Sequence, residues 1–251
     1  MKINKKAHFF AVSFVLVMIV VIIAASISFG RDIKNSEKSL EILTKTQDAY
    51  VARDINSQFA KDSASLSAQQ AFQGVASMGG TFGDCFPETI NGVKYVVWND
   101  KCNPNTEKIK ADFPNDVRII FDKYLLGYDA VYSFSLDKNI LTATAKNKNQ
   151  PISVSSENII VSSTYDPSFL IDLNDLGIYL GDFESLYLSV KGCNKKVDCI
   201  KDLDLKRWKI SDVSENAEAI TMKISTEKSF FFIKNKKVQY SPIDMNIELK
   251  Q

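Results

Sequence analysis

The chain has 251 residues, of which 45% are hydrophobic, with 31 Lys and Arg against 30 Asp and Glu, one His and four Cys. Three lysines precede the first apolar run, so residues 8–251 are slightly acidic, with 28 basic and 30 acidic side chains. Such a balance lacks the basic face that nucleic-acid binding requires, and one His is too few for most histidine-based metal or triad chemistry. The composition therefore argues against a nucleic-acid partner and indicates no particular reaction.

An uncharged apolar segment of 21 residues runs from Phe9 to Phe29. As a helix it measures about 31 Å, which matches the hydrocarbon core of a bilayer. Helix is the expected conformation, because every backbone N–H must be satisfied within the segment when lipid surrounds it. We therefore expect a transmembrane helix over residues 8–30, with the lipid bilayer as its partner.

The flanks of this segment predict its orientation. Lys2, Lys5 and Lys6 make the N-terminal flank the more positive one, and the positive flank of a short terminus stays in the cytoplasm. Residues 1–7 are then a cytoplasmic stub, and residues 31–251 are extracytoplasmic. The expected localisation is the cell membrane, with a single pass.

Three fates of the apolar segment are open. It is longer than the apolar region of most signal peptides, which favours an uncleaved anchor. The small residues Ala24, Ser26 and Ser28 are also suitable positions for cleavage by an ordinary signal peptidase. The third fate is cleavage on the cytoplasmic side, which would retain the helix in the mature protein.

A short motif precedes the apolar segment, in which Lys5-Lys6-Ala7 is followed by His8-Phe9-Phe10. It resembles the class III signal peptide of archaeal type IV pilin-like proteins, where a basic pair and a Gly or Ala precede the apolar helix. The chain has Ala instead of the more familiar Gly, and it lacks a Glu at the fifth position after the cut. The resemblance implies a processing site between Ala7 and His8, a processing peptidase and an assembly apparatus in the inner membrane.

A long helix is predicted next, over residues 32–78. This run contains no Pro and no Gly before Gly74, and it ends at Met78-Gly79-Gly80, where Gly enters a left-handed cap without strain. Six apolar residues share a sector about 100° wide and predict one buried stripe, namely Ile33, Leu40, Val51, Ile55, Phe59 and Leu66. Apolar residues surround the last turns, which predicts that the following domain encloses them.

The long helix has two interpretations. A membrane helix that continues into it resembles the layout of a type IV pilin, whose long N-terminal helix lies half in the membrane and half against a head built on an antiparallel sheet. Alternatively, residues 31–80 form a stalk that only spaces the head from the lipid. A parallel coiled-coil dimer is disfavoured, because Asp54, Ser57 and Lys61 would occupy its seam.

Residues 81–251 are expected to form an α+β head, with a mainly antiparallel sheet and one or two helices. Helical spacing predicts a helix over residues 114–127, with Pro114 in its first turn, and Asp182 is placed to cap a second over residues 183–190. Apolar runs and period-two alternation predict strands at 95–98, 132–136, 140–146, 159–161, 169–173, 220–224, 230–233 and 243–249. The alternation indicates a sheet that buries one face.

All four cysteines, Cys85, Cys102, Cys193 and Cys199, lie in the expected extracytoplasmic part. An even number there favours structural disulfides, and pairing of Cys85 with Cys102 and of Cys193 with Cys199 is favoured among three connectivities. The first bridge closes a loop of about 18 residues and would stabilise the fold by about 3 kcal/mol. Zinc is the alternative, but the cysteine spacings exceed those of zinc knuckles and the only His lies at the membrane edge.

An acidic patch consists of Asp172, Asn174, Asp175 and Asp182. Apolar residues occupy the fifth and twelfth positions of a calcium-binding EF-hand register here, so we interpret the patch as a solvated turn and helix cap. The chain has no GxSxG, HExxH, P-loop or GxGxxG motif, and a Ser/Lys dyad would need only two common residues that no motif marks. We therefore expect no catalytic, cofactor-binding or metal-binding residues.

Two functions of different classes follow. The first is a membrane-anchored surface protein, a pilin-like structural or adhesive subunit that associates with its own copies or with other surface or pilus proteins. The second is a tethered exported enzyme or ligand-binding head. A pocket in the head with converging carboxylates or a Ser/Lys pair would favour the second.

Overall fold

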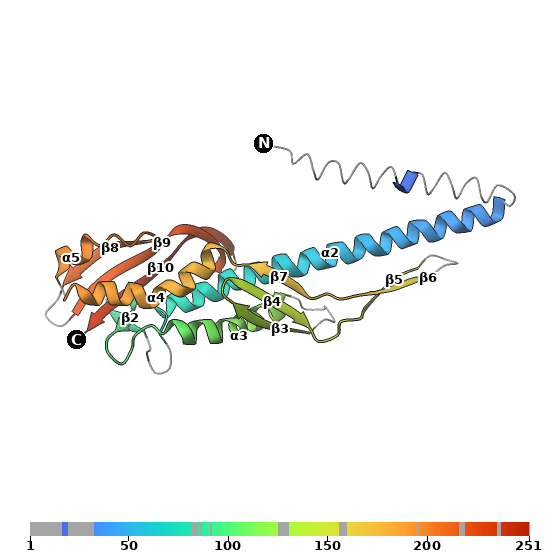
Figure 1. Cartoon of the computed structure of the whole chain (residues 1–251). Coiled ribbons are helices and arrows are strands. Elements are labelled where there is room, and N and C mark those ends of the chain that lie inside the picture. Colours follow the sequence, from blue (N-terminus) through green and yellow to red (C-terminus); the bar gives the residue numbers. More distant parts are fainter. Residues whose placement is uncertain are drawn as a thin grey trace. The chain divides into compact units, whose positions relative to one another are not determined.

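The structure is a computed structural model of the chain (Figure 1). It describes residues 17–19, 33–81, 85, 87–90, 92–124, 131–155, 160–194, 196–215, 219–234 and 237–250. None of the helices formed by these residues combines the length and the apolar character needed to cross a membrane. Most of the expected transmembrane segment, and the processing site between Ala7 and His8, lie outside the described residues and stay predictions.

The chain divides into two compact units. One comprises residues 1–55 and 151–165, and the other comprises residues 56–150 and 166–251. The boundary falls inside one continuous helix, α2 (Ile33–Ser77), so the stalk expected at residues 31–80 spans both units. In the first unit, the N-terminal part of α2 is accompanied by a two-stranded sheet of β5 (Gln150–Ser155) and β6 (Ile160–Tyr165).

The described part of the second unit contains two further sheets. The larger one has the strand order β1 (Glu88–Ile90), β2 (Val93–Trp98), β10 (Lys237–Lys250), β9 (Ala219–Lys234) and β8 (Trp208–Glu215). Its β2–β10 pair is parallel and the other pairs are antiparallel. The smaller one is antiparallel, with the order β3 (Tyr132–Asp137), β4 (Ile140–Ala145) and β7 (Phe169–Asp172). The predicted α+β class with a mainly antiparallel sheet is confirmed.

Three more helices are described in this unit: α3 (Thr106–Tyr124), α4 (Asp175–Gly192) and the short α5 (Val197–Lys201). The five-stranded sheet buries one face, because Ile220, Met222 and Ile224 of β9 are buried and the residues between them are half exposed. Both α4 and the C-terminal part of α2 lie along this sheet (Figure 1) and contribute to the same core.

The buried face of α2 is not the predicted one. Val51, Ile55 and Phe59 of the expected stripe are half or more exposed. Small residues occupy most of the buried positions instead, and Phe72 and Val75 near the end of the helix are bulky exceptions. The small ones are Ala49, Ala60, Ser63, Ala64, Ser67, Ala68, Ala71 and Ala76. Small side chains let neighbouring elements approach the helix axis closely, whereas bulky ones would hold them away. The prediction of a buried bulky stripe was therefore wrong for these residues.

The smaller sheet depends on this close approach. Ala60 and Ala64 of α2 form one apolar cluster with Phe121 of α3 and with Tyr132 and Phe169 of the sheet. The three aromatic rings stack edge-on or tilted, with centroids 5.4 to 6.4 Å apart. At the other end of α2, Ala68, Ala71 and Ala76 join the larger core with Phe72, so the prediction that the head encloses these turns is confirmed.

The end of α2 needs two glycines. Gly79 and Gly80 both have positive φ values, 57° and 69°, as expected for a helix that stops at a glycine pair. A Cβ at Gly80 would lie 2.9 Å from the ring of Phe183, and the carbonyl of Gly79 accepts a hydrogen bond from the Trp98 indole at 3.0 Å. Backbone conformation and close packing therefore coincide at this turn.

Two predicted helix starts were wrong. Helix α3 begins at Thr106, because the Asn105 side chain accepts a hydrogen bond from the N–H of Lys108 (2.8 Å) and caps the first turn, which leaves Pro114 in the helix interior. Helix α4 begins at Asp175, so Asp182 lies in its middle rather than at its cap. Strands β1, β5 and β8 and the short helix α5 were not predicted, and none of the three strands combines a long apolar run with regular alternation.

Candidate functional site

Both disulfides lie in the second unit. Cys85 is bonded to Cys102 and Cys193 to Cys199, each with a Cα–Cα distance of 5.5 Å. This is the pairing that the spacing favours, and it uses every cysteine of the chain, so no thiolate is left for zinc. Disulfides persist in oxidising compartments, which is consistent with an extracytoplasmic head.

The residues of the acidic patch make separate contacts. Asp172 accepts a hydrogen bond from the N–H of Asn174 (2.9 Å), Asp175 pairs with Lys228, and Asp182 pairs with Arg207 at 3.0 Å. Across the part of the chain that the structure describes, no group of three or more His, Cys, Asp or Glu is arranged to hold a metal ion. Asp175 and Asp182 thus connect α4 to the sheet. Asp172, Asn174 and Asp175 do line one hollow, but the Asp175 carboxylate is paired there with Lys228.

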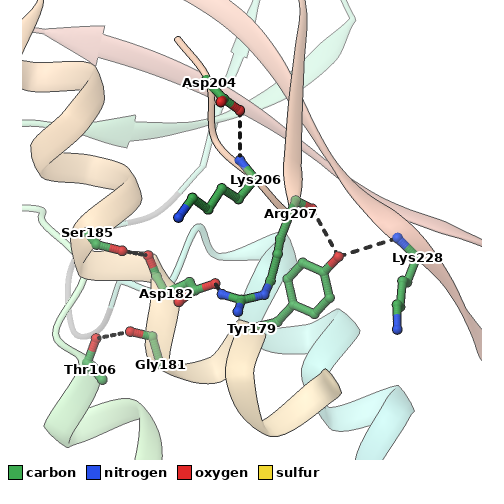
Figure 2. Close-up of polar contacts among 9 residues, drawn as sticks. All are labelled: Thr106, Tyr179, Gly181, Asp182, Ser185, Asp204, Lys206, Arg207 and Lys228. Carbon is green, nitrogen blue, oxygen red and sulfur yellow. Dashed lines mark hydrogen bonds and ion pairs between the residues drawn. The ribbon is translucent and has the colours of Figure 1, made fainter. Parts of the chain in front are cut away.

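The hydroxyl of Tyr179 lies between Arg207 and Lys228 (Figure 2). Its hydroxyl donates to the carbonyl of Arg207 (2.9 Å) and accepts from the N–H of Lys228 (3.3 Å). Burial raises the pKa of the Tyr179 phenol above its ordinary value. The hydrogen bond to Asp175 raises the pKa of Lys228. The arrangement ties α4 to the start of β8 and to β9, and we interpret it as structural.

The enzyme hypothesis expects a Ser/Lys pair or converging carboxylates in a pocket. Lys110 lines a groove together with Ser133 and Ser135, but no hydrogen bond joins it to either serine. Instead, Ser133 donates to the carbonyl of Thr144 at 3.3 Å. Shared lining alone does not activate a serine, since the base must reach the hydroxyl proton.

A second hollow of the head is lined by two lysines, Lys191 and Lys250. Each amine is paired with a carboxylate, Lys191 with Asp100 at 2.5 Å and Lys250 with Glu88 at 2.6 Å. These ion pairs raise the pKa of both lysines, so both amines are protonated and are not nucleophilic at neutral pH. Neither hollow provides the groups that the enzyme hypothesis requires.

The candidate functional surface is therefore the exposed side of α2. Val51, Ile55 and Phe59 follow one another at a spacing of four residues and form one ridge on the helix, which we call the α2 ridge. Their exposed fractions are 50%, 62% and 52%. Isolated exposed apolar residues are normal, but a continuous ridge of bulky ones marks an interaction surface.

Sequence reasoning found the residues of the α2 ridge but assigned them to the wrong side of the helix. The signal that could have corrected this is the spacing of the small residues, since Ala60, Ala64, Ala68 and Ala71 recur at intervals of three and four. That is the spacing of one helix face. From Ala60 onward this small face packs into the cores of the head.

The processing residues Ala7 and His8 lie outside the described residues, so no geometry bears on them. The chain matches no protein-family model, no curated protein and no solved structure. The functional conclusion therefore rests on the sequence pattern, the disulfides and the α2 ridge.

Proposed function

We propose that the chain is a membrane-anchored extracytoplasmic surface protein, a pilin-like structural subunit whose copies associate through the α2 ridge. The observation that carries the proposal is the exposure of Val51, Ile55 and Phe59 on a helix that begins a few residues after the expected transmembrane segment. The disulfide-bonded head and the pilin-like motif around Ala7 and His8 support it.

A common membrane anchor favours contact between identical surfaces. Copies inserted in one bilayer hold α2 at the same height, so the ridge of one copy meets the ridge of the next at a high effective concentration. The bulky apolar side chains of both copies are then removed from contact with water. Their burial stabilises association by about 25 cal/mol per Å² of buried apolar surface. The proposed occupant of the α2 ridge is thus a second copy of this chain.

Intact mass of the protein extracted from native membranes, with and without reductant, tests the anchor and the processing. We expect a mature chain that begins at His8 and gains two mass units per reduced disulfide. Recovery only as a dispersed soluble monomer that begins near Phe29 would contradict the proposal. A chain that begins at Met1 would retain the anchor and contradict the pilin-like processing.

The tethered enzyme or ligand-binding head is the second candidate, and no contact of the described residues specifically favours it. The two candidates differ in what the substitutions Val51→Ser, Ile55→Ser and Phe59→Ser would do. Association of copies in the membrane should be lost in the triple variant if the first is correct, with the head still folded. An enzyme would retain its activity in the same variant.

A further inference from the structure

A groove of about 410 Å³ lies between α3 and β3 in the second unit. Lys110, Pro114 and Arg118 line it from α3, and residues 133–136 line it from β3. A hollow above one face of a strand is lined by alternate residues, because successive side chains point to opposite faces. Four consecutive lining residues therefore place this groove, which we call the β3 groove, along the edge of the strand.

The register of β3 shows which backbone groups point into the groove. The N–H of Lys146 donates to the carbonyl of Val131 (2.8 Å), one step beyond the pair of Tyr132 with Ala145. Hydrogen-bonded pairs alternate in an antiparallel ladder, so residues 133 and 135 also bond to β4. The N–H and C=O groups of Phe134 and Leu136 therefore point away from β4, toward the outer edge.

This edge lacks the kinds of protection found at three strand edges of the larger sheet. Strand β1 has three residues, and β8 is interrupted by a register shift next to Asp212, whose φ is 52°. Side chains of α2 cap the outer edge of β9, where Gln69 accepts from the N–H of Phe231 (2.7 Å) and Gln70 accepts from that of Ile233 (2.6 Å). Strand β3 pairs along all six residues without a bulge, a proline or a lysine. Unprotected edges of this kind accept another strand.

The charge of the β3 groove indicates what kind of strand it accepts. Its lining contains Lys110 and Arg118 and no acidic residue. Arg118 donates a hydrogen bond to Asn115 (3.1 Å) and makes one long ion pair with Asp122 at 3.6 Å. Both contacts are exposed, and exposed contacts of this kind are worth little and leave the guanidinium able to change partner. Pro114 has no N–H to donate to the carbonyl of Lys110 four residues earlier. The backbone carbonyl of Lys110 is therefore an additional hydrogen-bond acceptor.

We propose that the β3 groove binds an extended acidic peptide segment of a partner protein as an additional strand of the small sheet. The backbone of the segment bonds to the N–H and C=O groups of Phe134 and Leu136. Its acidic side chains pair with Lys110 and Arg118. This is the strand-addition mode of peptide recognition, in which backbone bonds supply affinity and side chains supply specificity. The inference does not rest on the proposed function of the α2 ridge.

The test uses the full chain in detergent micelles, labelled with ¹⁵N at Phe and Leu. The probe is a pool of capped peptides of about ten residues, which alternate threonine and valine and carry two glutamates at varied positions. We expect amide shifts at Phe134 and Leu136. N-methylation of the peptide on the residues that face β3 should weaken binding at least about tenfold, whereas N-methylation of the alternate residues should leave it unchanged, since only one backbone edge bonds.

The charge requirement is tested with Lys110→Glu and Arg118→Glu. The double variant should no longer bind the glutamate-containing peptides, and it should bind the pool in which lysine replaces glutamate. As the matched control, Lys108→Glu on the exposed side of α3 should bind as the unmodified chain does. The proposal is overturned if no peptide of the pool shifts the amide signals of Phe134 and Leu136, or if both N-methylated forms bind equally. It is also overturned if these amides are protected from hydrogen exchange by pairing between copies of the chain, which dilution of the protein would reverse.

Discussion

The two apolar faces of α2 differ in the size of their side chains. One face carries alanines and serines and is buried against both sheets of the head, as at Ala64, which is fully buried. The other carries Val51, Ile55 and Phe59, which are half or more exposed. Hydrophobicity alone would favour burial of the bulky face, because more apolar surface would then be removed from contact with water.

Close packing explains the opposite choice. The smaller sheet contacts α2 at Ala60 and Ala64, where aromatic rings of the sheet and of α3 fill the space that larger residues on the helix would occupy. Folding of the head thus uses the small face and leaves the bulky one available for association. Before the helix enters the larger core at Phe72, side-chain size rather than apolar character therefore decides which face of α2 packs on the head.

The largest expected effect compares two phenylalanines of α2. Phe72 is fully buried and lies 5.5 to 6.1 Å from the rings of Tyr179, Phe183 and Phe230, whereas Phe59 is 52% exposed. Phe72→Ala should lower the free energy of unfolding by about 3–5 kcal/mol, and Phe59→Ala by less than about 0.5 kcal/mol. Urea unfolding followed by tryptophan fluorescence measures both. Equal losses would remove the distinction between the faces.

The next effect compares two glycines at the end of α2. At Gly80, a Cβ would combine a φ of 69° with a 2.9 Å approach to Phe183, whereas at Gly74 it meets nothing within 4 Å. Gly80→Ala should cost about 2 kcal/mol or more, and Gly74→Ala should stabilise the head by about 0.5–1 kcal/mol. Thermal unfolding of the two variants checks the prediction. Stabilisation by Gly80→Ala would show that the turn is not packed as described.

The smallest expected effect is on the pH dependence of stability. It concerns Tyr179, whose ring packs on the buried side of α2. Burial raises its pKa, so above about pH 10 the folded chain keeps a phenol proton that the unfolded chain loses. The folded state then binds more protons, and stability falls as the pH rises from about 10. The raised pKa of Lys228 acts in the same direction.

Replacing this tyrosine separates its contribution. Tyr179→Phe should lower stability at neutral pH, because the hydroxyl contacts to Arg207 and Lys228 are lost. The same variant should show a shallower decline above pH 10, since one of the titrating groups is absent. Unfolding free energies from pH 7 to 11 test this, and identical slopes in both proteins would contradict it.

The sequence predicted much of the fold but little of the candidate surfaces. Period-two alternation located β9 and β10, and the glycine pair located the end of α2, because both signals are local. The burial of α2 could not be predicted in the same way, since it depends on which elements from distant parts of the chain approach the helix. The start of α3 was missed because Asn105 caps it ahead of a proline that suggested a later start.

The two proposed interaction sites were hidden for a related reason. The α2 ridge was visible as a pattern, but its exposure depends on which elements pack on each face of the helix. The β3 groove was invisible, because the sequence shows that β3 is a strand and does not show that it is an edge strand facing Lys110 and Arg118. Strand order follows from long-range pairing, here of β4 with β7.

Cysteine cross-linking in native membranes tests the central claim most directly, because every natural cysteine is in a disulfide. Ile55→Cys lies on the α2 ridge, and Lys61→Cys is a control that is also exposed and lies about 120° around the helix. We predict that oxidation links two copies through position 55 and not through position 61. Efficient linking at 61 with none at 55, or no linking at either, would contradict association through the α2 ridge.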